Sequence, residues 1–365
     1  MIKVAVVGLG KMGVSHHALV NAHPDIDLVA VCDSSSYVLG VLRKYTGVKT
    51  YNDYDQLLRD EPDLDAVVIA TPSRTHAPMV RAALERELNV FCEKPLTLSA
   101  QESEELADLA EGRQLVTQVG YHNRFVGAFR EVKRLLEAEA IGRVTHLLGE
   151  AYGPVVLKPK GGTWRSQRIE GGGCLYDYAA HPLNLMSWYV GAPIGVAGTV
   201  LNSVFSQDID DEVFSTIHFA DRQTAQLSVN WSDESQRKMT TKIGIWGTAG
   251  HIYVDRQECR VYLRDTATPP AEYQHGWNLR YTTELTEPVS FYLRGEEYSS
   301  QIDQFAKNVA TRTPGENDFR SAAVTDTVIS MLIADARAGS VTEADGAVME
   351  LPRRRRRRRF RFART

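Results

Sequence analysis

The chain has 365 residues, which is too long for one ordinary hydrophobic core and predicts two domains. Its composition, with 43% hydrophobic and 24% charged residues, is that of a globular protein, and it contains no run of about 20 apolar residues to span a bilayer. A strand pattern starts at Ile2, where a secreted protein would carry a charged and apolar leader. We therefore expect a cytoplasmic protein without a membrane partner.

The net charge of −4 is unevenly distributed. Nine of the 42 basic residues are arginines within residues 353–365, so the remainder carries 33 basic and 46 acidic side chains. An acidic body is a poor surface for nucleic acid, and we expect no specific nucleic-acid partner. The arginines repel one another, so residues 341–365 are predicted to be a disordered tail. The four cysteines lack the spacing of metal ligands, and we expect neither a metal nor a disulfide.

The first 122 residues alternate short apolar strands with helices. The predicted strands are residues 3–7, 28–32, 50–51, 66–70, 89–92 and 115–120, and the predicted helices are residues 13–22, 39–45, 54–59, 78–86 and 99–111. Continuous apolar strands separated by helices are typical of a parallel sheet that is covered on both faces. This pattern predicts an α/β domain over residues 1–122.

The pattern changes after Phe125. A helix over residues 126–139 and two amphipathic helices over 295–310 and 319–338 accompany longer strands with alternating polarity. These strands are residues 144–151, 196–205, 213–219, 224–231, 238–246 and 251–254, and we assign Trp231, Trp246 and Trp277 to the sheet and core. Alternation predicts an open, mostly antiparallel sheet with one covered face, and therefore an α+β domain over residues 123–340.

A glycine-rich turn follows the first strand. Gly8, Gly10 and Gly13 fit the pattern G-x-G-x-x-G, with Lys11 and Met12 between them. The turn lies between a buried strand and a helix, which is the context in which such glycines bind a dinucleotide. The backbone then approaches the diphosphate closely, and the N–H groups of the helix N-terminus face the anion.

Asp33 ends the second predicted strand, twenty residues after Gly13. A carboxylate at this position binds the ribose 2′-hydroxyl and repels a 2′-phosphate, so we expect NAD rather than NADP. The alternative is that Asp33 only caps the following helix.

Four further segments carry a family resemblance. They are Ala-Thr-Pro-Ser-Arg-Thr-His-Ala-Pro at residues 70–78, Glu-Lys-Pro at 93–95, Gly-Tyr-His-Asn-Arg-Phe at 120–125 and Gly-Gly-Gly-Cys-Leu-Tyr-Asp-Tyr-Ala-Ala-His-Pro at 171–182. With the glycine turn, these segments resemble the glucose–fructose oxidoreductase, inositol dehydrogenase and MocA (Gfo/Idh/MocA) family over residues 1 to about 340. The resemblance implies a Rossmann domain followed by an open-sheet domain for substrate binding and oligomerisation, with the active site between them.

Three residues are predicted to carry out catalysis. Asp177 and His181 are four residues apart, which on an α-helix would place them on one face and let the carboxylate orient the imidazole. Lys94 lies between a strand and a proline, and the resemblance implies that it lies near nicotinamide and substrate. We expect His181 to be the general acid and base, supported by Asp177 and Lys94.

Further residues are predicted to contact the cofactor or the substrate. We count Thr71, Ser73, His76, Glu93, Lys94 and Asn123 among the cofactor contacts. The candidate substrate contacts, besides the three catalytic residues, are Tyr152, Trp164, Arg165 and Asn184, because aromatic faces and polar forks suit sugars.

Together these features predict an NAD(H)-dependent oxidoreductase. Hydride would move between nicotinamide and a carbinol or keto carbon of a sugar, cyclitol or nucleotide-sugar. The chain should form a homodimer or homotetramer, because the strands over residues 196–246 would otherwise expose a large apolar surface. Two alternatives remain open, namely an oxidoreductase for dihydrodiols or bilins and a non-catalytic NAD-binding sensor.

Overall fold

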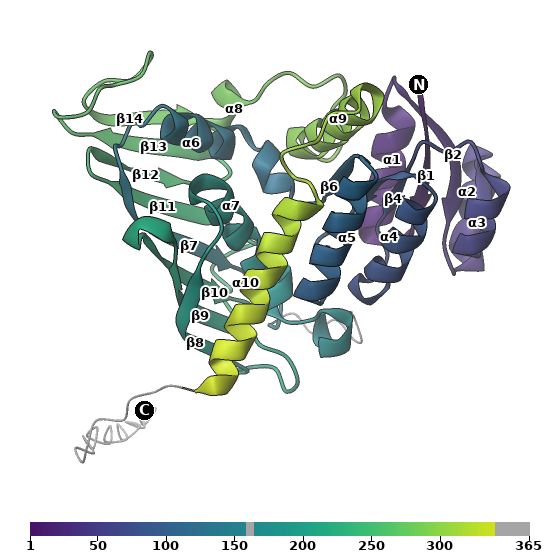
Figure 1. The fold of residues 1–365 in the computed structure, drawn as a ribbon, viewed down its shortest axis with the longest axis horizontal. Helices are drawn as coiled ribbons and strands as arrows, with labels where there is room; N and C mark the ends of the chain where they lie inside the picture. The colour runs from purple at the N-terminus through teal and green to yellow at the C-terminus, as the bar shows by residue number, and fades with distance from the viewer. Residues whose placement is uncertain (158–163, 340–365) are drawn as a thin grey trace, which may run out of the picture.

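The computed structural model describes residues 1–157 and 164–339 (Figure 1). The predicted tail over residues 341–365 lies outside the described residues.

The first sheet is a parallel sheet of six strands in the order β3-β2-β1-β4-β5-β6. Its strands are β1 Ile2–Val7, β2 Ile26–Cys32, β3 Lys49–Tyr51, β4 Ala66–Ile69, β5 Asn89–Cys92 and β6 Thr117–Val119. The order reverses direction between β1 and β4, and ligands of such sheets bind at the carboxyl ends of the strands near this reversal. The predicted parallel sheet is confirmed.

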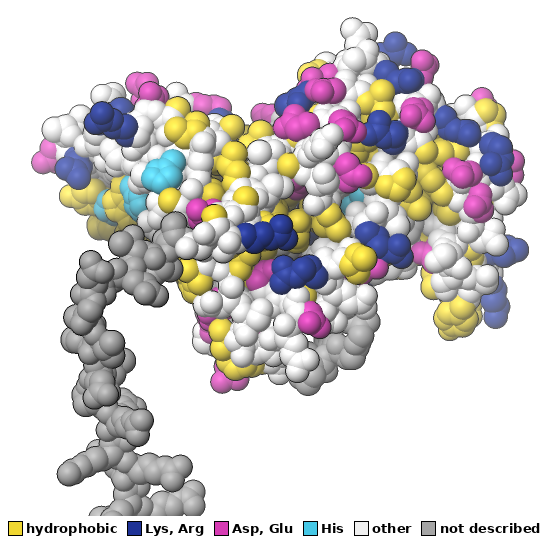
Figure 2. Space-filling view, turned by 60° about the horizontal axis from the view of Figure 1, so that its bottom comes forward, with side chains coloured by type: hydrophobic (Ala, Val, Ile, Leu, Met, Phe, Trp, Pro, Cys, Tyr) yellow, Lys and Arg dark blue, Asp and Glu magenta, His cyan; other side chains and the backbone are white. Residues whose placement is uncertain are grey.

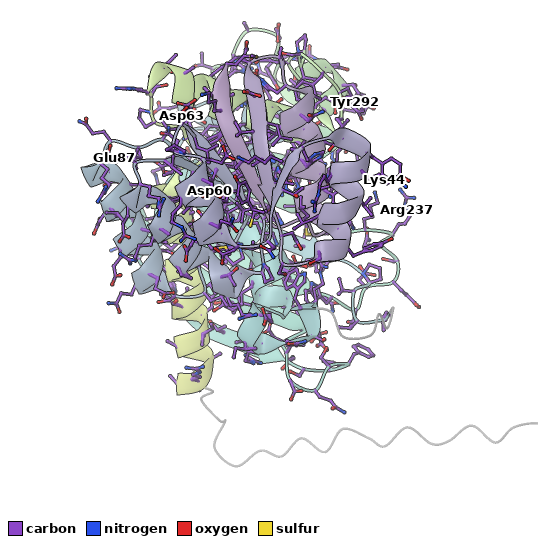
Figure 3. All side chains as sticks on the ribbon, turned by 90° about the vertical axis from the view of Figure 1, so that its right-hand side faces the viewer. Lys44, Asp60, Asp63, Glu87, Arg237 and Tyr292 are labelled. Atoms are coloured by element: carbon purple, nitrogen blue, oxygen red, sulfur yellow. The ribbon has the colours of Figure 1, made fainter. Side chains whose placement is uncertain are left out.

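Helices cover both faces of this sheet. One face packs against α1 Lys11–Ala22, α2 Ser36–Thr46 and α9 Glu296–Thr311, and the other against α3 Tyr54–Asp60, α4 His76–Glu85 and α5 Ala100–Gly112. Figure 3 views the first sheet from its edge, and in it Lys44 of α2 and Asp60 of α3 lie on opposite sides of the strands. Helix α9 therefore belongs to the covering of the first sheet, although the sequence places it after the second.

The second sheet has eight strands in the order β14-β13-β12-β11-β7-β10-β9-β8. They are β7 Val144–Tyr152, β8 Gly195–Asn202, β9 Glu212–His218, β10 Thr224–Asn230, β11 Lys242–Gly247, β12 Gly250–Val254, β13 Glu258–Leu263 and β14 Gly276–Tyr281. Only β7 and β10 pair in parallel, so the prediction of a mostly antiparallel sheet is confirmed. Strands β13 and β14 were not predicted.

One face of the second sheet is covered by helices (Figure 1). These are α6 Gly127–Glu137, α7 Ala180–Val190 and α10 Phe319–Ala338. A π-helical segment, Leu175–Ala179, leads into α7, and α8 spans Thr282–Leu285. Short 3₁₀ segments occur at Ser73–Thr75, His122–Phe125, Trp164–Ser166, Arg168–Glu170 and Ala220–Arg222. We call the opposite, uncovered face of this sheet the outer face.

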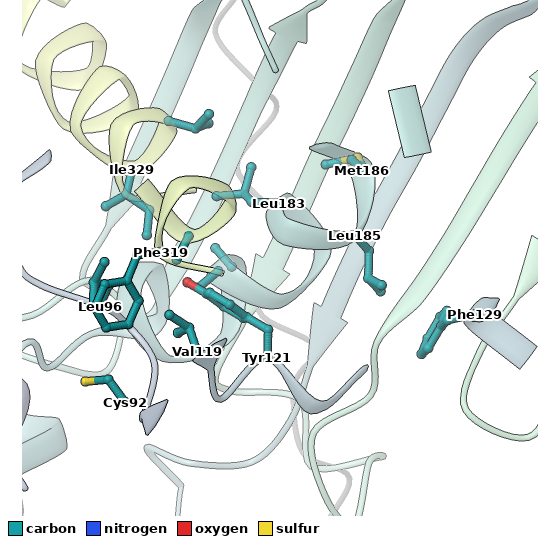
Figure 4. Close-up of a cluster of buried hydrophobic side chains, with 14 of the residues drawn as sticks. Cys92, Leu96, Val119, Tyr121, Phe129, Leu183, Leu185, Met186, Phe319 and Ile329 are labelled. Carbon is teal, nitrogen blue, oxygen red and sulfur yellow. The ribbon is translucent and has the colours of Figure 1, made fainter. Parts of the chain in front are cut away.

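A continuous hydrophobic core joins the two sheets (Figure 4). Val119 comes from β6, Leu96 from the loop after β5, Leu183 from α7 and Phe319 from α10, and the fully buried ring of Tyr121 lies among them. This core holds the carboxyl ends of the parallel strands against α7. Within the described ranges, no helix has the length and apolar character needed to cross a membrane.

Candidate active site

The glycine turn leaves space for a ligand at the start of α1. A Cβ on Gly13 would lie 1.6 Å from the carbonyl oxygen of Gly8, and Gly8 itself has a φ of +86° and lies against Ala70, so side chains are excluded at both positions. A Cβ on Gly10, by contrast, would meet nothing within 4 Å. Gly10 caps α1 without a side-chain hydrogen bond, so the first N–H groups of the helix remain available to an anion.

Asp33 lies at the carboxyl end of β2, beside this turn. Its carboxylate accepts hydrogen bonds from the backbone N–H groups of Leu9, at 2.5 Å, and Ser35, at 2.7 Å. Ser35, not Asp33, caps α2 through a bond from the N–H of Val38, so the alternative role of Asp33 as the cap is excluded. A fixed carboxylate and an open helix N-terminus together fit the ribose and the diphosphate of NAD.

Lys11 and Met12 form the first turn of α1, with Lys11 exposed and Met12 half-buried. Thr71 and Ser73 follow β4. The methyl group of Thr71 faces Gly8, and Ser73 lies beside Gly171, from the segment that precedes the π-helix. Both residues therefore lie at the carboxyl end of the sheet, Thr71 beside the glycine turn and Ser73 beside Gly171.

His76 is buried between the loops that follow β4 and β5. Its Nδ1 lies 2.8 Å from the carbonyl oxygen of Pro95, and its Nε2 lies 3.0 Å from that of Thr71. Burial lowers the pKa of His76, and the neutral ring carries a single N–H, so it donates to one of these two carbonyls. His76 thus lies between the loop after β4 and the loop that carries Lys94.

Glu93 is buried at the end of β5. Its Oε1 lies 2.7 Å from Nε2 of His16, and its Oε2 accepts the N–H of Lys94. Burial favours a raised pKa for Glu93, but the bond and charge of His16, together with Lys94, outweigh it and lower the pKa. The carboxylate also packs against Gly120. Because it accepts the N–H of Lys94 as well, it helps to fix the backbone at Lys94.

Lys94, Asp177 and Arg165 form a charged cluster between the two sheets. The Nζ of Lys94 lies 2.7 Å from Oδ1 of Asp177, and Nε of Arg165 lies 2.9 Å from Oδ2. Burial alone would raise the pKa of Asp177, but the two cations outweigh it and lower the pKa. Asp177 is therefore a carboxylate, and Lys94 is held at the carboxyl end of β5.

His181 lies near this cluster on α7. It is buried, and its Nδ1 has no hydrogen-bond partner among the described residues. Burial and the positive charges of Lys94 and Arg256 lower the pKa of His181 well below its ordinary value. The imidazole is therefore neutral near pH 7 and able to accept a proton.

The predicted pairing of Asp177 with His181 differs from the structure. Within the described part of the chain, no hydrogen bond joins them, and both oxygens of Asp177 are engaged by Lys94 and Arg165. The physical reason is that Leu175–Ala179 is a π-helix. A π-helix has a wider turn than an α-helix, so Asp177 and His181, four residues apart, do not lie on one face as they would on an α-helix.

Other residues near His181 were missed from the sequence. The ring of His122 lies 5.2 Å from that of His181 and stacks on Tyr298 at 4.8 Å. Arg256, from the turn between β12 and β13, lies 3.2 Å from Nε2 of His122 and pairs with Glu297 of α9. His122 stood within a segment of family resemblance, but nothing in the sequence brings residues 256 and 297 to it.

The remaining candidates are only partly brought together. The ring of Trp164 lies 4.6 Å from the guanidinium of Arg165 and so borders the charged cluster. Asn123 is buried, its Nδ2 donates to Thr241, and its Oδ1 has no partner among the described residues. Asn184 is engaged by Arg124 and Thr325 and is unavailable to a substrate.

Tyr152 does not join the site. Gly149 of the same strand packs against Met186 of α7, so alternation directs Tyr152 to the outer face. There its hydroxyl bonds to Glu150 and Ser228. In the described ranges, no group of three or more metal-ligating side chains occurs, and the four cysteines are free and buried.

Two family models match the chain. Residues 2–121 match the one described as "Oxidoreductase family, NAD-binding Rossmann fold", and residues 129–253 match the GFO/IDH/MocA C-terminal domain. Scyllo-inositol 2-dehydrogenase (NAD(+)) of Bacillus subtilis (strain 168) is 27% identical over 257 residues, which cover 69% of this chain and 73% of that enzyme. Levoglucosan dehydrogenase of Pseudarthrobacter phenanthrenivorans is 26% identical over 298 residues, or 71% and 76% of the two chains.

A solved structure of levoglucosan dehydrogenase in complex with NADH and L-sorbose superposes with a TM-score of 0.82 at 22% identity. The match covers 93% of this chain and 97% of that one, and it shows that the two proteins share this fold over the matched length. With both domains matched, the chain belongs to the Gfo/Idh/MocA family of oxidoreductases, and its first domain is an NAD-binding Rossmann fold.

Proposed function

We propose that this oxidoreductase transfers hydride between NAD(H) and a carbinol or keto carbon of a cyclic polyol, in the class of sugars, cyclitols and nucleotide-sugars. One observation carries the proposal. Lys94 pairs with Asp177 at the carboxyl end of the NAD-binding sheet, and the buried His181 lies close enough for the charge of Lys94 to lower its pKa. This is where the nicotinamide end of a dinucleotide lies in doubly wound sheets.

The residues divide the chemistry between them. When bound, NAD takes hydride from the carbinol carbon, so the protein has only the hydroxyl proton to accept. His181 accepts it, because its lowered pKa leaves the ring neutral. The ammonium of Lys94 stabilises the negative charge that develops on the substrate oxygen. In the reverse direction, His181 must first take up a proton from water, which it then gives to the alkoxide formed by hydride transfer.

Asp177 acts as a positioning group in this scheme. One oxygen of its carboxylate accepts a hydrogen bond from Lys94 and the other accepts one from Arg165, so its negative charge offsets the repulsion between the two cations. Lys94 also donates to the backbone carbonyl of Asp177, at 3.0 Å, which fixes the ammonium further. The substrate oxygen therefore meets a cation whose place is set by two hydrogen bonds.

The surroundings favour a polyhydroxylated ring as substrate. Arg165 is partly exposed and presents several N–H donors, and the indole of Trp164 lies beneath it. The N–H donors of a guanidinium bind hydroxyl groups. The face of an aromatic ring packs against the C–H face of a sugar. The relatives named after inositol and levoglucosan act on molecules of this kind.

We also propose that the outer face forms a homodimer or homotetramer interface. Aromatic rings lie in a row across it from β7 to β14, and Phe214 and Trp277 are exposed there. The row consists of His146, Trp246, Tyr253, His251, Tyr262 and Trp277. In Figure 2, histidines lie among hydrophobic side chains on the lobe of the second sheet. A large apolar patch of this kind is seldom left in contact with water.

A substrate panel tests the proposed activity. The full chain is mixed with NAD⁺ and, separately, scyllo-inositol, myo-inositol, levoglucosan, glucose or a trans-dihydrodiol, and NADH formation is followed by absorbance. We expect turnover of at least one cyclic polyol and its loss by about 10²–10⁴-fold in His181→Ala. The matched control is His275→Ala, which removes an exposed histidine from the loop before β14.

Two outcomes contradict the proposal. Turnover of the dihydrodiol alone would move the enzyme to another substrate class. NADH binding without turnover of any compound would favour a sensor.

A further inference from the structure

The segment before α9 brings an arginine to the start of α1. Arg294 donates from one guanidinium nitrogen to Oγ of Ser15, at 2.6 Å, and from another to Sδ of Met12, at 3.3 Å. Met12 and Ser15 lie on one face of the first turns of α1, next to the glycine turn. Arg294 is exposed and comes 279 residues after Ser15 in the chain. Its guanidinium thus lies within about one helical turn, 5.4 Å of rise, of the open N-terminus of α1.

The same arginine lies in line with the catalytic residues. Its guanidinium lies 4.8 Å from the ring centre of Tyr298, which stacks on His122 at 4.8 Å. His122 in turn lies 5.2 Å from His181. Arg294 and Tyr298 therefore connect the start of α1 with His122 and His181.

The backbone around Arg294 is anchored to the first domain. Phe291 and Leu293 pack against the hydrophobic cluster that α1 and α9 share, and the ring of Phe291 contacts His23 of α1's end at 5.7 Å. The guanidinium therefore reaches α1 from a fixed point.

No carboxylate pairs with Arg294 in the described part of the chain, although Glu296 and Glu297 follow it at the start of α9. Among the described residues, its side-chain partners are a hydroxyl, a thioether and an aromatic ring, and the first turn of α1 has no acidic residue. The neighbouring Arg256, by comparison, pairs with Glu297. The N-terminus of a helix carries partial positive charge, so a cation beside it is unfavourable unless an anion binds between them.

We propose that Arg294 binds the diphosphate of NAD(H), facing the helix N-terminus across it. A guanidinium matches two phosphate oxygens with parallel N–H donors, and its loss removes a charge-assisted hydrogen bond. Because Arg294 follows the second sheet in the chain, cofactor affinity then depends on residues from both halves of the protein. The inference rests on NAD binding by the first domain and not on the chemistry proposed for Lys94 and His181.

The test compares ligands with and without a diphosphate. Dissociation constants of the full-length protein are measured by calorimetry for NADH, ADP-ribose and adenosine, in wild type and in Arg294→Gln. We expect NADH and ADP-ribose to bind about ten- to a hundredfold more weakly in the variant, and adenosine to be unchanged within about twofold. The NADH affinity of wild type should also fall more steeply with salt concentration than that of the variant.

A matched control and a conservative variant complete the test. Arg312→Gln removes an exposed arginine at the opposite end of α9 and should leave all three constants unchanged. Arg294→Lys should recover part of the affinity for NADH and ADP-ribose, since it keeps the positive charge but not the paired N–H donors of the guanidinium. Equal affinity of wild type and Arg294→Gln for NADH would overturn the proposal. So would an equal loss for adenosine, because that result indicates a structural effect on the whole domain.

Discussion

Replacing Lys94 with Met should impair both turnover and folding stability, because Lys94 neutralises a carboxylate that is buried between the domains. The side chains of Lys94 and Asp177 are only 14% and 7% exposed, so neither charge is well solvated. Removing one partner of a buried pair typically costs about 3–5 kcal/mol. Arg165 still holds the other carboxylate oxygen, which favours a cost near about 3 kcal/mol in this chain.

The expected effects differ in size and can be measured separately. At about 2 °C per kcal/mol for a chain of this size, Tm should fall by about 6 °C in calorimetry. The kcat should fall by about 10²–10⁴-fold, because the developing alkoxide loses its cation. The Kd for NADH should stay within several-fold of wild type, since the glycine turn and Asp33 are untouched.

Two further variants make this prediction sharper. Lys307→Met removes an exposed lysine of α9 and should leave turnover and Tm unchanged. Combining Lys94→Met with Asp177→Asn should cost less stability than the sum of the single changes, because the carboxylate left unpaired by the first is removed by the second. Wild-type kcat in Lys94→Met, or strictly additive stability losses, would refute the reasoning.

Four other predictions follow from the structure. Wild type should prefer NAD(H), and Asp33→Ala should raise kcat/KM with NADP(H) relative to NAD(H), because the carboxylate repels a 2′-phosphate; an unchanged ratio would count against this role. Burial and Lys94 lower the pKa of His181, so the rising limb of kcat/KM for oxidation should lie below about pH 6.5 and disappear in His181→Ala; a limb that persists in the variant assigns the proton to another group. Burial raises the pKa of Asp326 from 3.8 to about 7, so the folded chain keeps a proton that the unfolded chain releases, and this contribution to stability is lost as pH rises from about 4 through 7. The Tm of Asp326→Asn relative to wild type should therefore increase over that interval, and a constant difference would contradict the assignment. Light scattering should show a dimer or tetramer that dissociates when Phe214 and Trp277 are both replaced by Glu, whereas a monomeric wild type would exclude the interface.

Local patterns predicted most of the fold. The strand–turn–helix around Gly8, Gly10 and Gly13 follows from residues close in sequence. The alternation of strands and helices predicted the first sheet, and the alternating polarity within strands predicted the second. Strand β14 was missed because it is the edge strand and none of its residues is buried, and β13 beside it was missed although alternate residues of it are buried. The packing of α9 on the first sheet was also missed, since an amphipathic pattern indicates a buried face but not the partner of that face.

The site was predicted in part for similar reasons. Lys94, Asp177 and Arg165 were all candidates. Their ion pairs depend on a π-helical turn that no pattern in the sequence predicts. Tyr152 was placed wrongly because the face of a strand residue depends on the register of its strand. Asn184 was assigned to a ligand although the folded chain engages its polar atoms. Arg256 and Arg294 reach the site only through contacts between distant segments.

Transfer of an isotope tests hydride transfer by this site most directly. A cyclic polyol that the enzyme oxidises is deuterated at its carbinol carbons and mixed with NAD⁺ and the full chain, and the NADH formed is examined by mass spectrometry and by NMR at nicotinamide C4. We predict one deuterium per NADH, at C4, with the labelled product formed about 10²–10⁴-fold more slowly by Lys94→Met and His181→Ala. NADH without deuterium, or labelled NADH formed at the wild-type rate by both variants, would contradict the proposed reaction.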